Sequence, residues 1–342
     1  MIVITYQSLK TSLIRKAALT KTPILGEFEL TSRCNFSCPM CYVKELKPKS
    51  ELSTAQWKLI FTEAVENGLL YALLTGGEPF IRPDFVELYE FLYDLGVKIT
   101  VYTNGSLLNE ALIQVFAKRP PEFIGLTLYG YNQASYEIMT KNNAGFQLFD
   151  QALDLLNQYH IQFALRTIPT QGIYQILDEI IQYAKSKDAY LGYQLYVGPK
   201  RNSDEDNHQL RLTPTQLLDF ETRIKTAFQN TTNQTLNMDT TYRTCAALKS
   251  AYFITWNGYM QPCAMVSTPR KKVLPGLLKA TFESLHDQML ACDHSEDCHH
   301  CEFYTHCMQC YARRTLEGHV NSCSKYLKDV AILKKRLENG DL

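Results

Sequence analysis

The chain has 342 residues, which is enough for one large domain and a smaller second one. Its 35 basic residues (Lys and Arg) balance 35 acidic ones (Asp and Glu), so no net charge attracts nucleic acid or an anionic membrane. No apolar run approaches the roughly 20 residues of a membrane-spanning helix, and residues 1–10 lack the charged start and apolar core of a signal peptide. We therefore expect a cytoplasmic protein that binds neither nucleic acid nor a membrane.

The cysteines are numerous and unevenly placed. There are eleven, although disulfides rarely persist in the cytoplasm. Three lie within residues 34–41, none lies within 42–244, and eight lie within 245–323. This clustering predicts two metal-binding regions separated by a cysteine-free scaffold.

Most of this scaffold alternates strands with helices. A short helix at 9–19 precedes a strand at 26–31. Ser53 then opens a helix, because Gln56 stands three residues later, as a capping box requires, and Gly68 ends it. Further strands are expected at 71–75, 97–103, 124–129, 161–168 and 190–197, with helices at 83–96, 107–118, 146–159 and 173–185. Six strands joined by helices of this length indicate a parallel α/β sheet.

The alternation ends at a polar stretch, residues 198–213, which is rich in turn-forming residues. We place a domain boundary there. We expect residues 1–200 to form the first domain, 201–235 a linker with a bridging helix at 214–230, and 236–342 a small cysteine-rich domain.

The first cysteine group follows the strand at 26–31. Cys34, Cys38 and Cys41 can close on one compact metal centre, and soft thiolates suit an iron–sulfur cluster. Three ligands on a four-iron cluster leave one iron open for chemistry. The alternative is structural zinc, which prefers four ligands. No Cys or His occurs between Cys41 and His160, so the zinc alternative lacks a local fourth ligand.

The C-x3-C-x2-C spacing, followed after the next strand by Gly76-Gly77-Glu78, resembles the signature of the radical S-adenosylmethionine (SAM) superfamily. The resemblance implies a partial (β/α)6 barrel over residues 22–200. It also implies that the amino and carboxylate groups of SAM chelate the open iron, and that SAM is reductively cleaved to a 5′-deoxyadenosyl radical. By the same resemblance Gly76 and Gly77 let the backbone approach SAM, and Glu78 accepts from its ammonium group.

Other residues at the strand ends have two interpretations each. Asn104 touches SAM or forms a turn. Arg166 pairs with the SAM carboxylate or with an acid of the core. Tyr129 stands where many members of the superfamily with a similar cysteine-rich carboxy-terminal tail carry Asp. Met40 stands where the superfamily usually has an aromatic residue beside the adenine of SAM.

The second cysteine group resembles the SPASM domain, which carries two auxiliary 4Fe–4S clusters in maturases of peptides and proteins. By resemblance the first auxiliary cluster is held by Cys245, Cys263 and Cys310, and the second by Cys298, Cys301, Cys307 and Cys323. Cys292 is either a fourth ligand of the first auxiliary cluster or a free thiol. The alternative is a pair of zinc sites, which would also use His294, His299, His300 and His306.

These resemblances predict a radical SAM enzyme with three 4Fe–4S clusters that oxidises or crosslinks a peptide or protein side chain. We expect an electron donor such as flavodoxin or ferredoxin. Only 33 residues precede Cys34, so leader recognition would need a separate protein, or the substrate has no leader. The alternatives are a radical SAM dehydrogenase of a small alcohol and a non-catalytic zinc-binding module.

Overall fold

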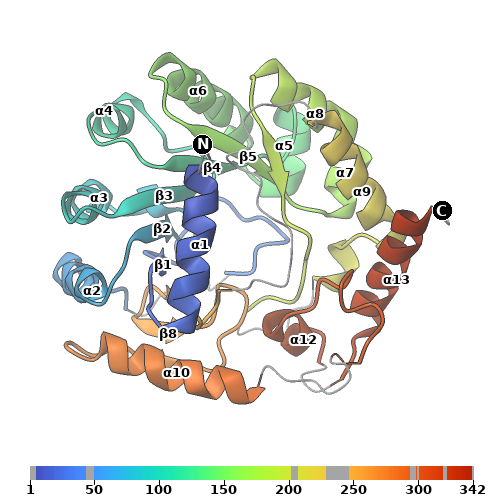
Figure 1. Cartoon of the computed structure of the whole chain (residues 1–342). Helices are drawn as coiled ribbons and strands as arrows, with labels where there is room; N and C mark the ends of the chain where they lie inside the picture. Colours follow the sequence, from blue (N-terminus) through green and yellow to red (C-terminus); the bar gives the residue numbers. More distant parts are fainter. Residues whose placement is uncertain are drawn as a thin grey trace.

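The computed structural model describes residues 5–43, 50–201, 207–228, 246–292, 298, 300–318 and 322–340. Within them, one curved sheet with the strand order β6-β5-β4-β3-β2-β1-β7-β8-β9 forms the centre of the molecule (Figure 1). The strands are β1 (Leu25–Glu29), β2 (Tyr71–Thr75), β3 (Lys98–Thr103), β4 (Phe123–Thr127), β5 (Phe163–Thr167), β6 (Leu191–Tyr193), β7 (Ala251–Ile254), β8 (Tyr259–Gln261) and β9 (Lys271–Lys272). Neighbours from β6 to β7 are parallel, whereas β8 and β9 are antiparallel.

Strands β1 to β6 confirm the six strands expected from the sequence. The helices between them lie on the outer face of the curved sheet (Figure 1). They are α2 (Thr54–Glu66), α3 (Phe85–Asp94), α4 (Glu110–Lys118), α6 (Gly145–Gln158) and α8 (Leu177–Ser186). Parallel strands in sequence order with helical crossovers form the expected α/β arrangement, a partial barrel.

The first crossover shows how local signals set the fold. The Ser53 hydroxyl accepts from the Gln56 backbone at 3.3 Å, and the Gln56 side chain accepts from the Ser53 backbone at 2.9 Å, which confirms the capping box. Helix α2 then packs Trp57 and Phe61 edge-on against Phe28 of β1, with ring centroids 6.2 and 5.0 Å apart. Burying one such ring stabilises the fold by about 1.5–3 kcal/mol.

The structure adds short elements that periodicity did not predict. Helix α5 (Gln133–Thr140) begins after Asn132, whose side chain accepts from the Ser135 backbone at 2.9 Å. The helix expected at 173–185 is two helices, α7 (Gln171–Gln175) and α8, which separate at Ile176. Two single turns of 3-10 helix are η1 (Pro79–Ile81) and η2 (His208–Leu210).

The sheet continues beyond the boundary expected at 198–213. Strand β7 pairs in parallel with β1, with Ala251 opposite Leu25. The remaining helices are α9 (Pro214–Ala227), α10 (Leu278–Cys292), α12 (Tyr311–Leu316) and α13 (Lys325–Asn339). Helix α13 packs against α9 and α10 packs against α2 (Figure 1). The carboxy-terminal part therefore contacts the barrel beside both its first and its last strands.

Helix α1 (Tyr6–Leu19), which confirms the expected short helix, covers the amino-terminal edge of the strands. The Lys10 ammonium pairs with Glu122, just before β4, at 2.7 Å and lies 4.3 Å from the ring centre of Tyr71, the first residue of β2. The carboxyl edge is left for a functional site.

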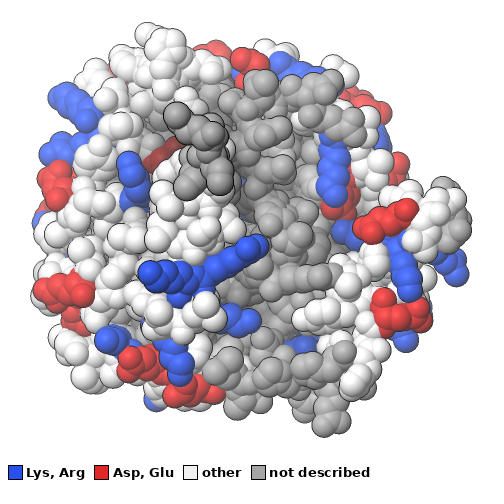
Figure 2. Space-filling view, in the orientation of Figure 1, with Lys and Arg blue, Asp and Glu red and all other residues white. Residues whose placement is uncertain are grey.

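The surface carries charges of both signs. On the face shown in Figure 2, Lys and Arg are interspersed with Asp and Glu. Among the described residues, no helix combines the length and the apolar character that a membrane span requires.

Candidate functional site

A cavity of about 540 Å³ opens at the carboxyl edge of the parallel strands. Its walls combine the ends of several strands with the loop that follows β1. The predicted site residues that line it are Cys34, Cys38, Cys41, Gly76, Gly77, Asn104 and Arg166. Because functional residues of parallel barrels gather at the carboxyl ends of strands, this cavity is the candidate functional site.

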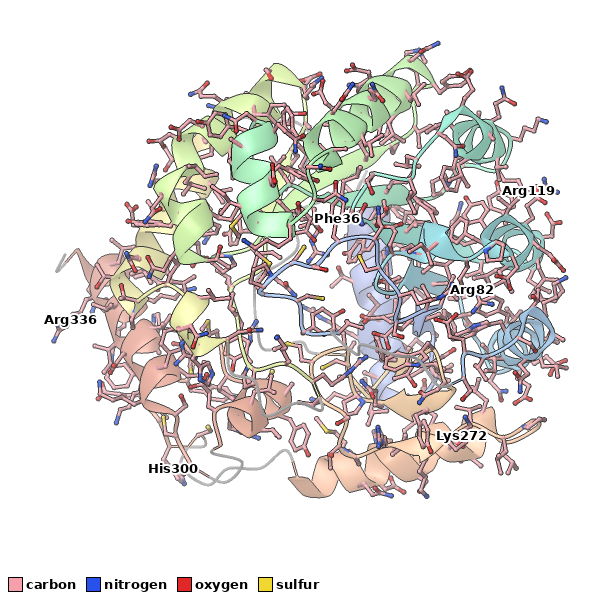
Figure 3. The ribbon with its side chains drawn as sticks, turned by 180° about the vertical axis from the view of Figure 1, so that it is seen from behind. Phe36, Arg82, Arg119, Lys272, His300 and Arg336 are labelled. Carbon is pink, nitrogen blue, oxygen red and sulfur yellow. The ribbon has the colours of Figure 1, made fainter. Side chains whose placement is uncertain are left out.

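The loop after β1 carries three cysteines to this cavity. Cys38 is buried, Cys41 is half-buried and Cys34 is exposed. The Cys41 backbone donates to the Cys38 carbonyl at 3.1 Å, which turns the loop back on itself. Phe36 holds the loop against α5, where its ring packs edge-on against Tyr136 with the centroids 6.1 Å apart (Figure 3).

The surroundings of these thiols oppose their ionisation in the absence of a metal. Although Cys34 is exposed by surface area, loss of hydration beside the cavity wall raises its pKa to about 12, and burial raises the pKa of Cys38 still further. The charge of Cys41 adds to both increases. Because thiolates are the species that bind metals, this set requires a centre that strongly favours thiolate ligands. An iron–sulfur cluster and zinc both fit that requirement.

Gly76 and Gly77 let the loop after β2 approach the loop after β1. The Gly77 backbone donates to the Thr31 carbonyl at 2.8 Å, and the Glu78 backbone donates to the Arg33 carbonyl at 2.9 Å. A Cβ atom at Gly77 would clash with the Arg33 carbonyl oxygen. The glycines are therefore required for contact between two loops, in addition to lining the cavity.

Glu78 lies behind the cavity wall and is fully buried. Its carboxylate accepts from the Thr103 hydroxyl at 2.8 Å and from the backbones of Asn104 and Phe80 at 2.8 and 3.2 Å. Burial raises its pKa to about 7, although these hydrogen bonds act in the opposite direction. The carboxylate joins the turn after β2 to the turn after β3, and it would bind a ligand's ammonium group only by exchanging one of these bonds.

Asn104 connects the turn after β3 to the cysteine loop. Its side-chain amide donates to the Asn35 side chain at 2.9 Å and to the Cys34 sulfur at 3.8 Å. The next residue, Gly105, has a φ of 80°, as expected for a turn, whereas Asn104 keeps a negative φ. Asn104 thus belongs to a turn and also lies on the cavity wall.

Two opposite charges lie on inner-face positions of the barrel. Arg166 on β5 stacks its guanidinium on the Tyr102 ring, 4.4 Å from the centroid. Burial raises the pKa of Glu27 on β1 to about 7, and the charge of Arg166 lowers it. Within the described part of the chain, no hydrogen bond reaches the Arg166 guanidinium, so it can receive a ligand carboxylate. Sequence reasoning missed Glu27 and Tyr102, although strand alternation could have placed both on the inner face.

Tyr129 and Met40 also line the cavity. The Tyr129 ring packs edge-on against Phe36, with centroids 6.3 Å apart. Its hydroxyl lowers the pKa of Cys38, against the larger effect of burial. At this position the chain therefore offers an aromatic wall beside the cysteine loop, where many relatives were expected to offer a carboxylate.

Two buried arginines fix the chain on either side of the cysteine loop. Arg82, which is 6% exposed, donates to the Leu30 carbonyl at 3.0 Å (Figure 3). Arg201 binds both carboxylate oxygens of Glu29 at 2.8 Å, and its backbone donates to the Tyr42 carbonyl at 3.0 Å. The loop is therefore held at its entry and at its exit.

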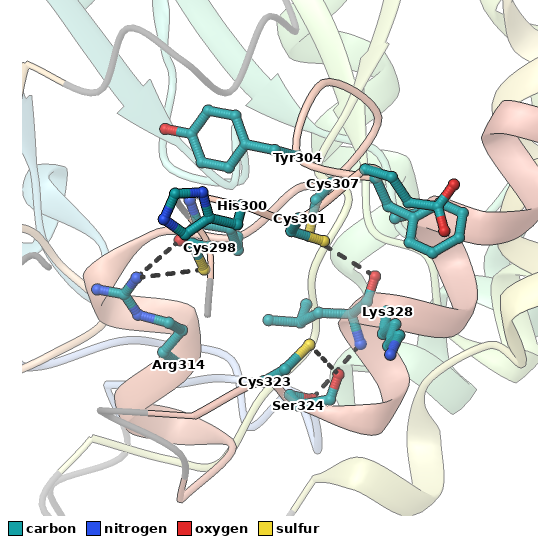
Figure 4. Close-up of a pocket in the computed structure, with 14 residues that line it drawn as sticks. Cys298, His300, Cys301, Tyr304, Cys307, Arg314, Cys323, Ser324 and Lys328 are labelled. Carbon is teal, nitrogen blue, oxygen red and sulfur yellow. Dashed lines mark hydrogen bonds between the residues drawn. The ribbon is translucent and has the colours of Figure 1, made fainter. Parts of the chain in front are cut away.

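A second cavity, of about 440 Å³, gathers four more cysteines (Figure 4). They are Cys298, Cys301, Cys307 and Cys323. Burial raises the pKa of Cys307 to about 11, and the charges of the other three contribute. The structure thus brings together the four residues expected to hold the second auxiliary cluster. We call this group the four-cysteine site.

The residues expected at the first auxiliary cluster are only partly described. Cys263 follows β8, and its neighbour Met265 lines the first cavity. Cys310 precedes α12 as its N-cap. Cys245 lies outside the described residues, and Cys292 ends α10 with a side chain that is not described. This ligand set stays a prediction.

Zinc stays an alternative for the described cysteines. Among the residues that the structure describes, no three Cys, His, Asp or Glu side chains could hold one metal ion. Structural zinc needs four ligands within about 2.0–2.3 Å of one ion. A four-iron cluster is larger and takes its thiolates on different irons. His300 lines the second cavity, His306 binds Glu338 at 2.9 Å, and His294 and His299 lie outside the described residues.

Comparison with known families supports the radical SAM resemblance inferred from the cysteine spacing. Residues 28–186 match the model of the radical SAM superfamily. The chain contains a radical SAM domain. The matched stretch includes the cysteine loop and strands β2 to β5, so the resemblance inferred from the cysteine spacing is confirmed.

Curated relatives of this chain carry names of different kinds. The AdoMet-dependent heme synthase of Methanosarcina barkeri is 24% identical over 56% of this chain and 55% of its own length. The PqqA peptide cyclase of Rhizobium meliloti is 34% identical over 35% of this chain and 32% of its own length. The sporulation killing factor maturation protein SkfB of Bacillus subtilis is 22% identical over 74% and 63%. The chain thus spans less than two thirds of the length of each.

Two solved structures share the fold over nearly the whole chain. Streptococcus suis SuiB bound to S-adenosylmethionine superposes with a TM-score of 0.73 and 16% identity, covering 96% of this chain and 84% of SuiB. Native anSMEcpe with bound AdoMet and Kp18Cys peptide superposes with a TM-score of 0.70 and 16% identity, covering 93% of this chain and 97% of anSMEcpe. At this identity the likeness shows the fold alone. It extends past the barrel into the cysteine-rich part, which is consistent with the SPASM-like spacing.

Proposed function

We propose that this protein is a radical SAM enzyme that oxidatively modifies or crosslinks a side chain of a peptide or protein. The observation that carries the proposal is the cavity in which three cysteines of one loop meet the carboxyl ends of the parallel strands. A structural metal site closes with protein ligands, whereas three thiols at an open cavity leave room for a molecule bound at the metal.

The cavity residues fit a 4Fe–4S cluster and SAM. Cys34, Cys38 and Cys41 provide three thiolates beside a space of about 540 Å³. When bound, the cluster and SAM together supply a 5′-deoxyadenosyl radical, which removes a hydrogen atom from an unactivated carbon.

The surrounding residues would orient SAM and exclude water. Arg166 offers its guanidinium to the SAM carboxylate, from a position fixed by the Tyr102 ring. Gly76 and Gly77 present backbone at the cavity wall. Asn104 lies beside them, and Glu78 supports this turn from behind through its bond to the Asn104 backbone. We assign these residues to SAM binding.

We further propose that the remaining cysteines hold two auxiliary 4Fe–4S clusters. The four-cysteine site supports the second of these. For the first we propose Cys245, Cys263 and Cys310, with Cys292 either as the fourth ligand or as a free thiol. Ligands drawn from distant positions would fasten a loop-rich segment to the barrel.

The peptide substrate is supported by relatives and neighbours. Two relatives are named as a peptide cyclase and a killing factor maturation protein. Two structural neighbours were solved with the precursor peptide SuiA and with a Kp18Cys peptide. The heme synthase among the relatives supports a small-molecule substrate instead, so a dehydrogenase of a small alcohol is the second candidate. An electron donor such as flavodoxin or ferredoxin completes the proposal, together with either a separate leader-binding protein or a substrate that has no leader.

The test uses anaerobically reconstituted protein, a reductant and SAM. Peptides encoded beside its gene are offered in one set of reactions and small alcohols in another. We expect a peptide to lose two hydrogens by mass spectrometry, with formation of 5′-deoxyadenosine. If no peptide changes mass while an alcohol is oxidised with stoichiometric 5′-deoxyadenosine, the dehydrogenase alternative is correct. The variant Cys34→Ala, which lacks one proposed cluster ligand, is the matched control.

A further inference from the structure

Arg314 lies in the wall of the four-cysteine site. Its side chain is 2% exposed. Its Nη1 atom donates to the Cys298 sulfur at 3.9 Å and to the Gln309 side chain at 3.1 Å (Figure 4). Because a guanidinium does not lose its proton in proteins, a permanent positive charge is buried against one of the four thiols.

The position of Arg314 is fixed by helix α12. The helix starts after Cys310, and its residues Tyr311 and Ala312 are buried in the hydrophobic core. Arg314 comes from the same short helix and extends toward the cysteines (Figure 4). The same Nη1 atom donates to Gln309, which precedes the helix and so also fixes the guanidinium. The contact with Cys298 is thus built into the packing of α12.

We propose that Arg314 sets the reduction potential of the cluster held by the four-cysteine site, an inference that rests on the proposed function. Hydrogen bonds to ligand sulfurs, net charge and burial determine the potentials of iron–sulfur clusters. A cation beside a ligand sulfur stabilises the reduced form more than the oxidised form, because the reduced form is more negative. Burial strengthens this interaction by lowering the local dielectric constant. Arg314 therefore makes this site easier to reduce.

Helix α12 also reaches the first cavity. Leu316, at its end, lines that cavity. Arg313 lies over the ring of Tyr196, another lining residue, at 5.5 Å from the centroid. The helix that carries Arg314 thus lies between the two cavities. The reduction potential that Arg314 sets would determine how readily a cluster in the four-cysteine site exchanges electrons with a molecule bound in the first cavity.

The experiment compares the reconstituted wild type with Arg314→Gln, Arg314→Lys and Arg313→Gln by redox titration followed by low-temperature electron paramagnetic resonance. In Arg314→Gln we expect one reduction step to become at least tenfold less favourable, which is about 59 mV for one electron. The other steps should not move. Arg314→Lys keeps the charge and should move the same step less. Arg313→Gln is the matched control, because it removes the same charge from α12 at a side chain that donates to the Met308 carbonyl.

Three results would overturn the inference. The first is an unchanged potential in Arg314→Gln with full iron content. The second is an equal shift in Arg313→Gln, which would show a general effect of charge. The third is loss of about four irons in both Arg314 variants, which would make the residue structural. A wild type that binds no iron would instead refute the proposed function, and iron analysis separates that case from the first three.

Discussion

The two cysteine sites are built in different ways. Cys34, Cys38 and Cys41 lie on one short loop at the edge of a parallel sheet, so strand pairing fixes where the loop starts. The four-cysteine site gathers residues from Cys298 to Cys323 between α10 and α13. One site offers three thiols to its cavity of about 540 Å³, and the other offers four thiols to a cavity of about 440 Å³. We call the three-cysteine site the open site, because under the proposed function three thiols leave one iron for a reacting molecule, whereas four thiols would occupy all four irons and suit electron exchange and structural support.

The most direct test of these different roles removes one thiol from each site. Cys34→Ala should abolish formation of 5′-deoxyadenosine from SAM, because a loss among three ligands destroys the open site. Cys323→Ala should leave SAM cleavage measurable, because the first cavity keeps all its thiols. Chromatography of the nucleoside products gives the result. Equal loss in both variants would contradict the division of roles.

Iron content tests the same division by stoichiometry. The wild type should hold about twelve irons in three four-iron clusters. A triple Ala variant at the open site (Cys34, Cys38, Cys41) should retain about eight, and so should a quadruple Ala variant at the four-cysteine site. Colorimetric iron and sulfide analysis after anaerobic reconstitution measures this. Stoichiometric zinc with little iron would favour the zinc alternative.

A methyl group at Gly77 should damage the open site alone. Gly77→Ala places a Cβ atom against the Arg33 carbonyl, which lies in the loop that carries the cysteines. We expect a loss of about 1–3 kcal/mol in the free energy of unfolding and weaker SAM binding. Gly192→Ala is the matched control, because its Cβ would lie 3.6 Å from the nearest atom, an ordinary contact. Thermal unfolding and equilibrium dialysis with SAM measure the two effects, and equal losses in both variants would refute the explanation.

Stability should also depend on pH through Glu78. Burial raises the pKa of Glu78 to about 7 from an ordinary value of 4.5. Between these values the folded chain keeps a proton that the unfolded chain releases, so stability falls as pH rises, by at most about 1.4 kcal/mol per pH unit. Glu78→Gln does not titrate, and its Tm should depend less on pH in this window. The same pH dependence in both proteins would show that Glu78 does not titrate as expected.

The sequence predicted the elements that depend on local signals. The Ser53 capping box, the six alternating strands and the three-cysteine loop are all readable from neighbouring residues. Strand β7 was missed, because four residues give too short a pattern and its partner β1 lies more than 200 residues earlier. The domain division at 198–213 stays a prediction, although β1 and β7 lie side by side in one sheet.

The candidate site was predictable in composition but not in contacts. The residues Cys34, Gly77 and Arg166 were chosen from motif spacing and strand position, and all three line the first cavity. The burial of Glu78 and the inner-face pair of Arg166 with Glu27 depend on strands brought together by folding. No local pattern reveals which strand a charge will face. The four-cysteine site was found because its spacing resembles a known family.

The ion pair between Arg201 and Glu29 limits where this protein can be cut into domains. Arg201 binds Glu29 at the end of β1 and also donates to the Ala264 carbonyl at 3.1 Å, beyond β8. A fragment cut after residue 200 would lack the Arg201 partner of Glu29 and would expose β1 as an edge strand. The barrel should therefore express poorly as an isolated fragment. A chimera that exchanges cysteine-rich tails between relatives should keep both Glu29 and Arg201.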